Sequence, residues 1–117
     1  MEESILTSIK TMLGILESDT AFDAELVSHI NSAISDLTQI AVGPDEGFII
    51  TGYTEIWSDF VDTVQMMSAS REYIFAKVRL IFDPPTNSFI CDAISKTRDE
   101  HFWRLSIMAD QAKGGLL

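Results

Sequence analysis

The sequence predicts an all-α fold, a small bundle of four to five helices around one central helix. Three observations predict it. Apolar residues recur at helical spacing along most of the 117 residues, as they do on helices with one buried face. The segment with strand-like composition, residues 48–51, is too short to build a sheet by itself. Within residues 73–82 only Lys77 and Arg79 are charged, and a helix that is apolar nearly all round belongs in the centre of a protein.

The first helix is expected over residues 4–13. Ser4 is a suitable N-terminal cap, and Gly14 is a suitable stop because glycine adopts left-handed backbone angles at little cost. The apolar residues of this helix share one stripe. They are Ile5, Ile9, Met12, Leu13 and Leu16.

The second helix is expected over residues 24–38, with Asp23 as its N-cap. Phe22 before the cap and Val27 four positions after it match a hydrophobic staple. His29 lies beside the apolar stripe, and no second ligand follows at a zinc-like spacing. We therefore interpret His29 as a hydrogen-bonding residue and not as a metal ligand.

A long loop separates the second helix from the central one. Residues 42–47 are rich in turn formers. Residues 48–51 are expected to form one short strand or extended arm, whose partner is either this chain or another copy of it. Residues 56–61 show a helical pattern that is either a single turn or the lead-in to the central helix.

The central helix is expected within residues 68–85 and ends in a rigid corner. Asp83 precedes a proline, and Pro84 and Pro85 cannot continue the hydrogen-bond ladder. Ten residues are predicted to form the core and this corner. They are Trp57, Phe60, Tyr73, Val78, Leu80, Ile81, Phe82, Asp83, Pro84 and Pro85.

The last helix is expected over residues 88–112, with a stop at Gly114 and Gly115. Its polar side pairs Asp92 with Lys96 and Glu100 with Arg104. Each pair at this spacing contributes about 0.2–0.5 kcal/mol to the helix.

The composition excludes several classes of function. The net charge is −10, from 18 acidic and eight basic residues, so sequence-specific binding to DNA or RNA is not expected. The hydrophobic content of 46% is a weak sign of surfaces buried by association. No apolar run is long enough to cross a membrane, and the acidic start is unlike a signal peptide. The single cysteine, Cys91, fits a reducing compartment. The sequence is interpreted as one domain, residues 1–117.

No pattern of residues indicates catalysis. Neither histidine lies in a motif that orients a serine or cysteine nucleophile. No phosphate-binding loop or dinucleotide fingerprint is present. The prediction is therefore a protein without enzymatic activity, metal or cofactor. One hypothesis of this kind is an acidic helical binding module, such as an antitoxin or an inhibitor, that occupies a basic partner.

A second hypothesis comes from a resemblance that covers nearly the whole chain. The matching stretches are residues 22–32, 39–44, 47–48, 57–60, 73–85 and 103–105. In this order and spacing they resemble the small head–tail connector proteins of bacteriophages and prophages. The block from Lys77 to Pro85 is the most specific part.

The resemblance implies a structural protein of the virion, assembled in the cytoplasm of the bacterial host. It implies a subunit that forms a ring under the portal, extends the DNA channel and joins head to tail. The implied partners are further copies of the chain, the portal protein and a downstream connector or tail protein, with DNA passing through without sequence-specific binding. No membrane and no cofactor are implied.

Apolar residues beyond those that one buried stripe needs are predicted to contact other subunits or the portal. They are Phe48, Ile49, Ile50, Tyr53, Phe102, Trp103 and Ile107. The alternative is that the two tryptophans, Trp57 and Trp103, are both core residues.

Overall fold

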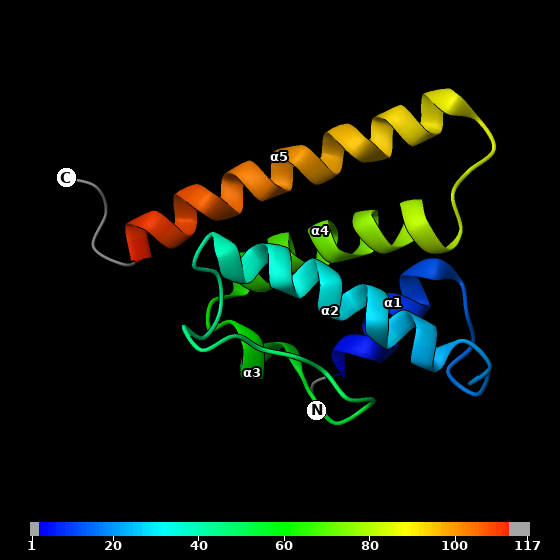
Figure 1. Ribbon diagram of the computed structural model, residues 1–117, viewed down its shortest axis with the longest axis horizontal. Helices are drawn as coiled ribbons and strands as arrows, with labels where there is room; N and C mark the ends of the chain where they lie inside the picture. Colours follow the sequence, from blue (N-terminus) through cyan, green and yellow to red (C-terminus); the bar gives the residue numbers. More distant parts are fainter. Residues whose placement is uncertain (1–2, 113–117) are drawn as a thin grey trace.

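The structure is a computed structural model that describes residues 3–112. Its elements are α1 (Ile5–Leu13), α2 (Asp23–Gln39), α3 (Trp57–Phe60), α4 (Val64–Phe82) and α5 (Ser88–Ala112) (Figure 1). Residues 3–112 contain no strand, and a single antiparallel bridge joins Ser4 to Ile56. The predicted all-α bundle is therefore confirmed.

α4 is the central helix. It packs against α1, α2 and α5, whereas α5 packs mainly against α4 (Figure 1). α4 begins four residues before the expected stretch, at Val64, because the Thr63 hydroxyl caps it by accepting a hydrogen bond from the Met66 amide at 3.1 Å. It ends at Phe82, immediately before Asp83 and the two prolines, as predicted.

The prediction that residues 73–82 form a buried rod is only partly confirmed, because Leu80 and Phe82 are partly exposed. Tyr73, Ile74 and Val78 are buried, but Ile81 is half exposed. The last turn of α4 directs Phe82 toward the bundle, where its ring meets Phe22 at a centroid distance of 5.3 Å. Ile81 therefore lies on a side of the turn that no other helix covers.

The start of α2 differs from the prediction. Asp23 is the first helical residue and Phe22 occupies the cap position, without a side-chain cap hydrogen bond. The Asp23 carboxylate instead binds the Lys10 ammonium and the Tyr53 hydroxyl. The Phe22 ring packs on Phe82 of α4. Contacts distant in sequence have taken the place of the local cap.

The short helix α3 is one turn, one of the two forms expected for residues 56–61. Trp57 and Phe60 are buried, as predicted, in a hydrophobic core to which all five helices contribute. The Trp57 indole donates a buried hydrogen bond of 2.9 Å to the Ser8 hydroxyl. This bond joins α3 to α1.

α5 has the predicted bounds. Of the two ion pairs expected along it, Glu100 with Arg104 forms, whereas no ion pair joins Asp92 to Lys96 in the described residues. The expected stop at Gly114 and Gly115 lies outside the described residues.

The C-terminal ends of α1 and α2 are each followed by a residue in the left-handed conformation. Gly14 closes α1 with φ +79°, as the sequence predicts. At the end of α2 the left-handed residue is Ala41, with φ +66°. The amide of Val42 returns to the Leu37 carbonyl at 3.0 Å, which is the hydrogen bond of a Schellman motif. Alanine is strained in this conformation, since its Cβ approaches the following carbonyl.

Replacing Ala41 with glycine is expected to stabilise the protein by about 0.5–1 kcal/mol, because relief of the strain exceeds the entropy that glycine adds to the unfolded chain. Urea denaturation followed by circular dichroism measures the change. The control is Gly14→Ala, which introduces the same strain at the end of α1 and should destabilise the protein. If both variants changed the free energy of unfolding in the same direction, the explanation would be contradicted.

Candidate assembly surfaces

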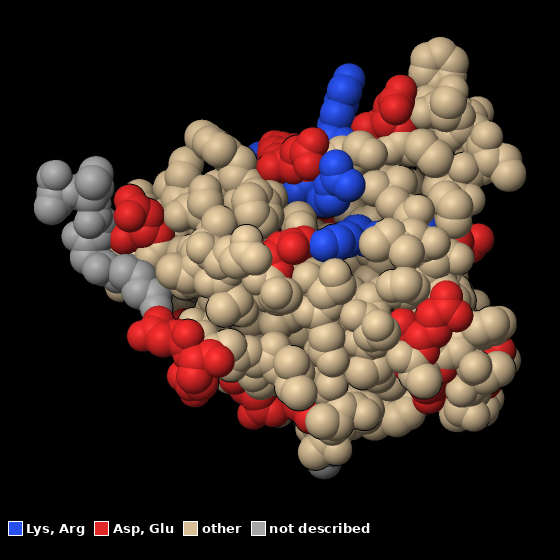
Figure 2. All heavy atoms as spheres, viewed as in Figure 1, with Lys and Arg blue, Asp and Glu red and all other residues tan. Residues whose placement is uncertain are grey.

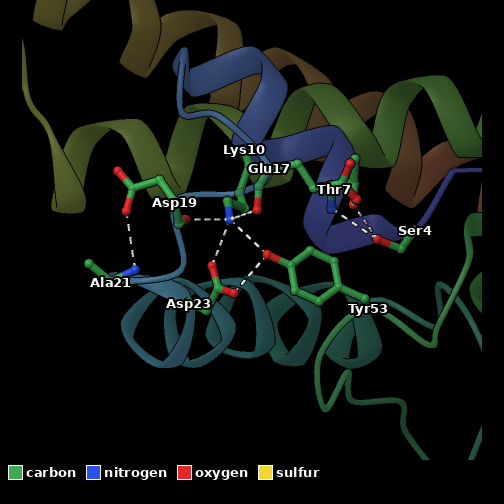
Figure 3. A network of polar contacts seen from close by, with 8 residues as sticks. All are labelled: Ser4, Thr7, Lys10, Glu17, Asp19, Ala21, Asp23 and Tyr53. Atoms are coloured by element: carbon green, nitrogen blue, oxygen red, sulfur yellow. Dashed lines mark hydrogen bonds and ion pairs between the residues drawn. The ribbon is translucent and has the colours of Figure 1, made fainter.

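A buried lysine fixes the loops at one end of the bundle (Figure 3). The Lys10 side chain is 1% exposed. Its ammonium donates to the Asp23 carboxylate at 2.8 Å, the Tyr53 hydroxyl at 2.7 Å and the Asp19 carbonyl at 2.7 Å. The Tyr53 hydroxyl in turn donates to the other Asp23 oxygen at 2.7 Å. Helices α1 and α2 and the loop before α3 are thus held at one point.

The electrostatics of this cluster favour the charged forms. Burial alone lowers the pKa of Lys10, but the hydrogen bonds and charges of Asp23 and Tyr53 outweigh it and raise that pKa above its ordinary value. The hydrogen bond from Lys10 holds the pKa of the Asp23 carboxyl below its ordinary value, against the effect of burial. The cluster is therefore an intact ion pair at neutral pH.

The hydrogen-bonding partner of the extended segment 48–51 is a side chain. The Asn31 amide of α2 donates to the Ile50 carbonyl at 3.0 Å and accepts from the Ile50 amide at 2.8 Å. This pair of bonds replaces the neighbouring strand that a β segment would need. The two hydrogen bonds orient the segment so that the Ile50 side chain lies in the core, 1% exposed, and the Ile49 side chain is exposed on the surface.

The turn after this segment is held by one carboxylate. Glu55 accepts hydrogen bonds from the amide and the hydroxyl of Thr51, at 2.9 and 2.8 Å. Burial alone would raise the pKa of Glu55, but these bonds prevail and lower it. The turn places Tyr53, which is partly exposed, beside Lys10.

A polar contact across the middle of the bundle joins α2 to α4. Asp36 accepts hydrogen bonds from the Tyr73 hydroxyl, at 2.8 Å, and from the Lys77 ammonium. Burial, with the hydrogen bond and charge of Asp36, raises the pKa of Tyr73. The Tyr73 ring packs on Phe102 of α5 at a centroid distance of 5.4 Å. Tyr73 therefore connects α4 to two of its neighbours, α2 and α5.

α5 exposes apolar side chains on its outer face. Trp103 is 63% exposed, and Ile107, one turn further on, is also exposed. Leu105 and Ala109, on the opposite side of the helix, are buried against the bundle. An exposed tryptophan beside an exposed isoleucine is typical of a surface that another protein covers.

A second apolar surface lies at the start of α5. A groove of about 290 Å³ runs between this part of α5 and the second half of α4. Phe89 on its rim is 83% exposed, and Ile90 is half exposed. The residues that line the groove are Glu72, Phe75, Ala76, Phe89, Ile90, Ala93, Ile94 and Thr97.

The predicted contact residues fall into three groups. Ile49, Tyr53, Trp103 and Ile107 are exposed and remain candidates. Ile50 is buried, so its prediction as a contact is wrong, because the Asn31 amide fixes the side of the segment that faces inward. Phe48 and Phe102 are partly buried against Phe60 and Tyr73, respectively, so each has only part of its surface available for a contact. Of the two tryptophans, Trp57 is core and Trp103 is not.

Sequence reasoning missed Phe89 and Ile90 as surface residues. Both fit the apolar rows of a helix over residues 88–112, and such rows are expected to face the core. The number of apolar rows on this helix could have shown that some of its apolar residues must be exposed. α5 carries apolar residues around most of its circumference, but a helix packed on one neighbour buries one row only.

Charge is divided between the two halves of the chain. Residues 1–63 hold 12 of the 18 acidic residues and one of the eight basic ones. On the face shown in Figure 2, Lys and Arg gather in the upper half, over α4 and α5, and Asp and Glu dominate the lower left edge, toward α3. The surface formed by α1, α2, α3 and their loops is therefore strongly acidic.

Neither a metal-binding cluster nor a membrane-spanning helix occurs in the described residues. No group of three or more His, Cys, Asp or Glu side chains within residues 3–112 lies close enough to hold a metal ion. None of the described helices combines the length and the apolar character that a membrane span requires.

Exposed apolar faces on a helical bundle are typical of proteins that act by assembling with others. The comparison with protein families agrees. The family model described as phage connector protein matches residues 5–112, so the chain belongs to that family. The protein is a structural phage connector and a component of the virion. No curated protein and no solved structure shows a significant similarity to it.

Proposed function

We propose that this connector subunit forms a ring under the portal, extends the DNA channel and joins the head to the tail. The observation that carries the proposal is the family match over residues 5–112, nearly the whole chain. Its partners are then further copies of itself, the portal protein and a downstream connector or tail protein. The subunit acts as a single domain, without catalysis and without a cofactor.

The distribution of apolar surface supports a ring. A ring needs a heterologous interface, in which one patch of a subunit meets a different patch of the next. The chain exposes two separate apolar patches, one around Trp103 and Ile107 and one around Phe89 and Ile90. Two dissimilar patches on one subunit are what head-to-tail contacts require.

The distribution of charge supports a channel through which DNA moves. A duplex carries a dense row of phosphates, and basic side chains would bind it and release counterions. The acidic half of this subunit repels the duplex instead. We propose that the acidic surface of α1, α2 and α3 faces the channel, so that DNA slides without sticking.

Replacing Trp103 and Ile107 together with serine is expected to abolish annular particles in negative-stain images of the protein mixed with its portal. Exposed substitutions of this kind change the free energy of unfolding by only about 0.5 kcal/mol, since they remove no core contact. Imaging and urea denaturation of the same samples separate assembly from folding.

The contrasting variant is Ile50→Ser, which removes a buried side chain. It should lower the free energy of unfolding by about 2–4 kcal/mol, because a cavity forms and a hydroxyl is buried. Unchanged rings with the Trp103 and Ile107 variant, or a protein that forms no ring with its portal at all, would contradict the proposed assembly.

A further inference from the structure

The groove between α4 and the start of α5 has no occupant within the described residues. Phe75 and Ala76 form its wall on α4, and Phe89, Ile90 and Ala93 form its wall on α5. Among the residues that line it, Glu72 is the only charged one. Glu72 forms no ion pair within the described part of the chain. A ligand for this groove should therefore be apolar, with one positive charge near it.

The sequence after α5 has this chemistry. It reads Lys113, Gly114, Gly115, Leu116 and Leu117. The two leucines supply apolar side chains, and the lysine supplies a positive charge that complements Glu72. Two glycines separate the lysine from the leucines.

The same chain cannot deliver this segment to its own groove. α5 is straight over its length (Figure 1), and the groove residue Ala93 lies nineteen positions before Ala112, its last residue. At 1.5 Å per residue this separation is about 28 Å. Five residues span at most about 17 Å when fully extended. Only the segment of another subunit can reach the groove.

We propose that Leu116 and Leu117 of a second copy bind in the groove between α4 and α5. The contact joins the C-terminal end of α5 in one subunit to the N-terminal end of α5 in the next. It is heterologous and repeats from subunit to subunit, so it closes a ring or continues as an open chain. The inference rests on the proposed ring and names one of its contacts. Each contact is small, and many of them act together once the ring closes.

The test uses the full chain with Leu116→Ser and Leu117→Ser, labelled with nitrogen-15. A synthetic peptide Lys-Gly-Gly-Leu-Leu is added, and amide resonances are followed by NMR. Saturable shifts are expected at Phe75, Phe89 and Ala93, at millimolar peptide concentration. The control peptide Lys-Gly-Gly-Ser-Ser should cause none. The second control is the same chain with Phe89→Ser, which is exposed and keeps the fold, and whose affinity for the peptide should fall at least tenfold.

The parallel measurement is assembly of the full chain with and without the two leucine substitutions, by imaging with the portal and by sedimentation. The substitutions should weaken assembly at least tenfold. Absence of peptide shifts, or normal rings from the substituted chain, would overturn the proposal. Shifts at the same residues caused by the portal protein and not by the peptide would also overturn it and assign the groove to the portal. Absence of rings from the unsubstituted chain, with peptide shifts present, would instead refute the proposed ring.

Discussion

Replacing Asp23 with alanine is expected to lower the free energy of unfolding by about 3–5 kcal/mol, the usual loss when one member of a buried ion pair is removed. The reason is that Lys10 is more deeply buried than Asp23. The Lys10 side chain is 1% exposed and the Asp23 side chain 21% exposed, so without Asp23 the ammonium stays inside the protein with no counter-charge. Urea denaturation at pH 7 measures the loss, which is a large share of the stability of a small domain.

Lys10→Met is the matched control. Methionine keeps most of the apolar stem and removes the buried charge, while Asp23 can still be hydrated from its exposed side. Its cost should therefore be clearly smaller than that of Asp23→Ala. The double variant should cost less than the sum of the two single ones, because the sites interact directly. Additive effects would show that Lys10 and Asp23 do not act as a pair.

The same pair predicts a pH dependence. The pKa of Asp23 is lower in the folded protein than its ordinary 3.8, so its contribution is complete above that value and is lost as the pH falls through the lowered pKa. The pKa of Lys10 is raised above 10.5, so its contribution is complete below that value and is lost only in stronger base. The stability difference between the wild type and Asp23→Ala should thus be constant from neutral pH to pH 5 and should shrink in acid.

Replacing Gly43 with alanine is expected to destabilise the protein by about 2–4 kcal/mol, from strain and overpacking together. The backbone of Gly43 has φ +88°, a conformation that strains alanine. A Cβ at this position would lie 2.5 Å from a ring carbon of Phe60. The Phe60 ring cannot move away freely, since it is buried and packs on Phe48. Thermal and urea denaturation measure the effect.

Gly47→Ala separates the two causes. Gly47 has φ +95°, but nothing lies within 4 Å of an added Cβ. This control keeps the strain and omits the collision, so it should cost about 1–2 kcal/mol. Adding Phe60→Leu to the Gly43 variant should recover part of its loss. Equal effects at Gly43 and Gly47 would show that the approach of Phe60 is unimportant.

Helix ends were predictable where the deciding contacts are local. Ser4 and Gly14 bound α1, and the prolines after Asp83 end α4, because each acts on its own backbone or its neighbours. The central position of α4 was also predictable, since its apolar surface needs partners on several sides. These features depend on residues that are close in sequence.

The prediction failed where a distant residue decides the local structure. The Asp23 carboxylate binds Lys10 and Tyr53, 13 and 30 positions away, which together outweigh a single capping bond. Ile49 and Ile50 are equivalent in composition, and only the Asn31 amide decides which of them is buried. No local pattern encodes these choices.

The candidate surfaces were predictable only in part, because packing against a distant helix decides which apolar residues are exposed. The excess of apolar residues correctly indicated that some must be exposed, and Trp103 and Ile107 are. Which residues of α5 are exposed depends on the side of the helix that α4 covers. The groove at Phe89 and Ile90 arises only because α5 has a single major neighbour.

The helix that joins the others is the fourth in the chain. α1 and α2 make few contacts with each other and meet mainly through α4. During synthesis on the ribosome, the first 63 residues therefore emerge before the segment against which they pack, and with most of the acidic charge. Because a net charge far from zero favours solubility, we expect this charge to keep the nascent segment soluble until residues 64–82 are available to cover its apolar stripes.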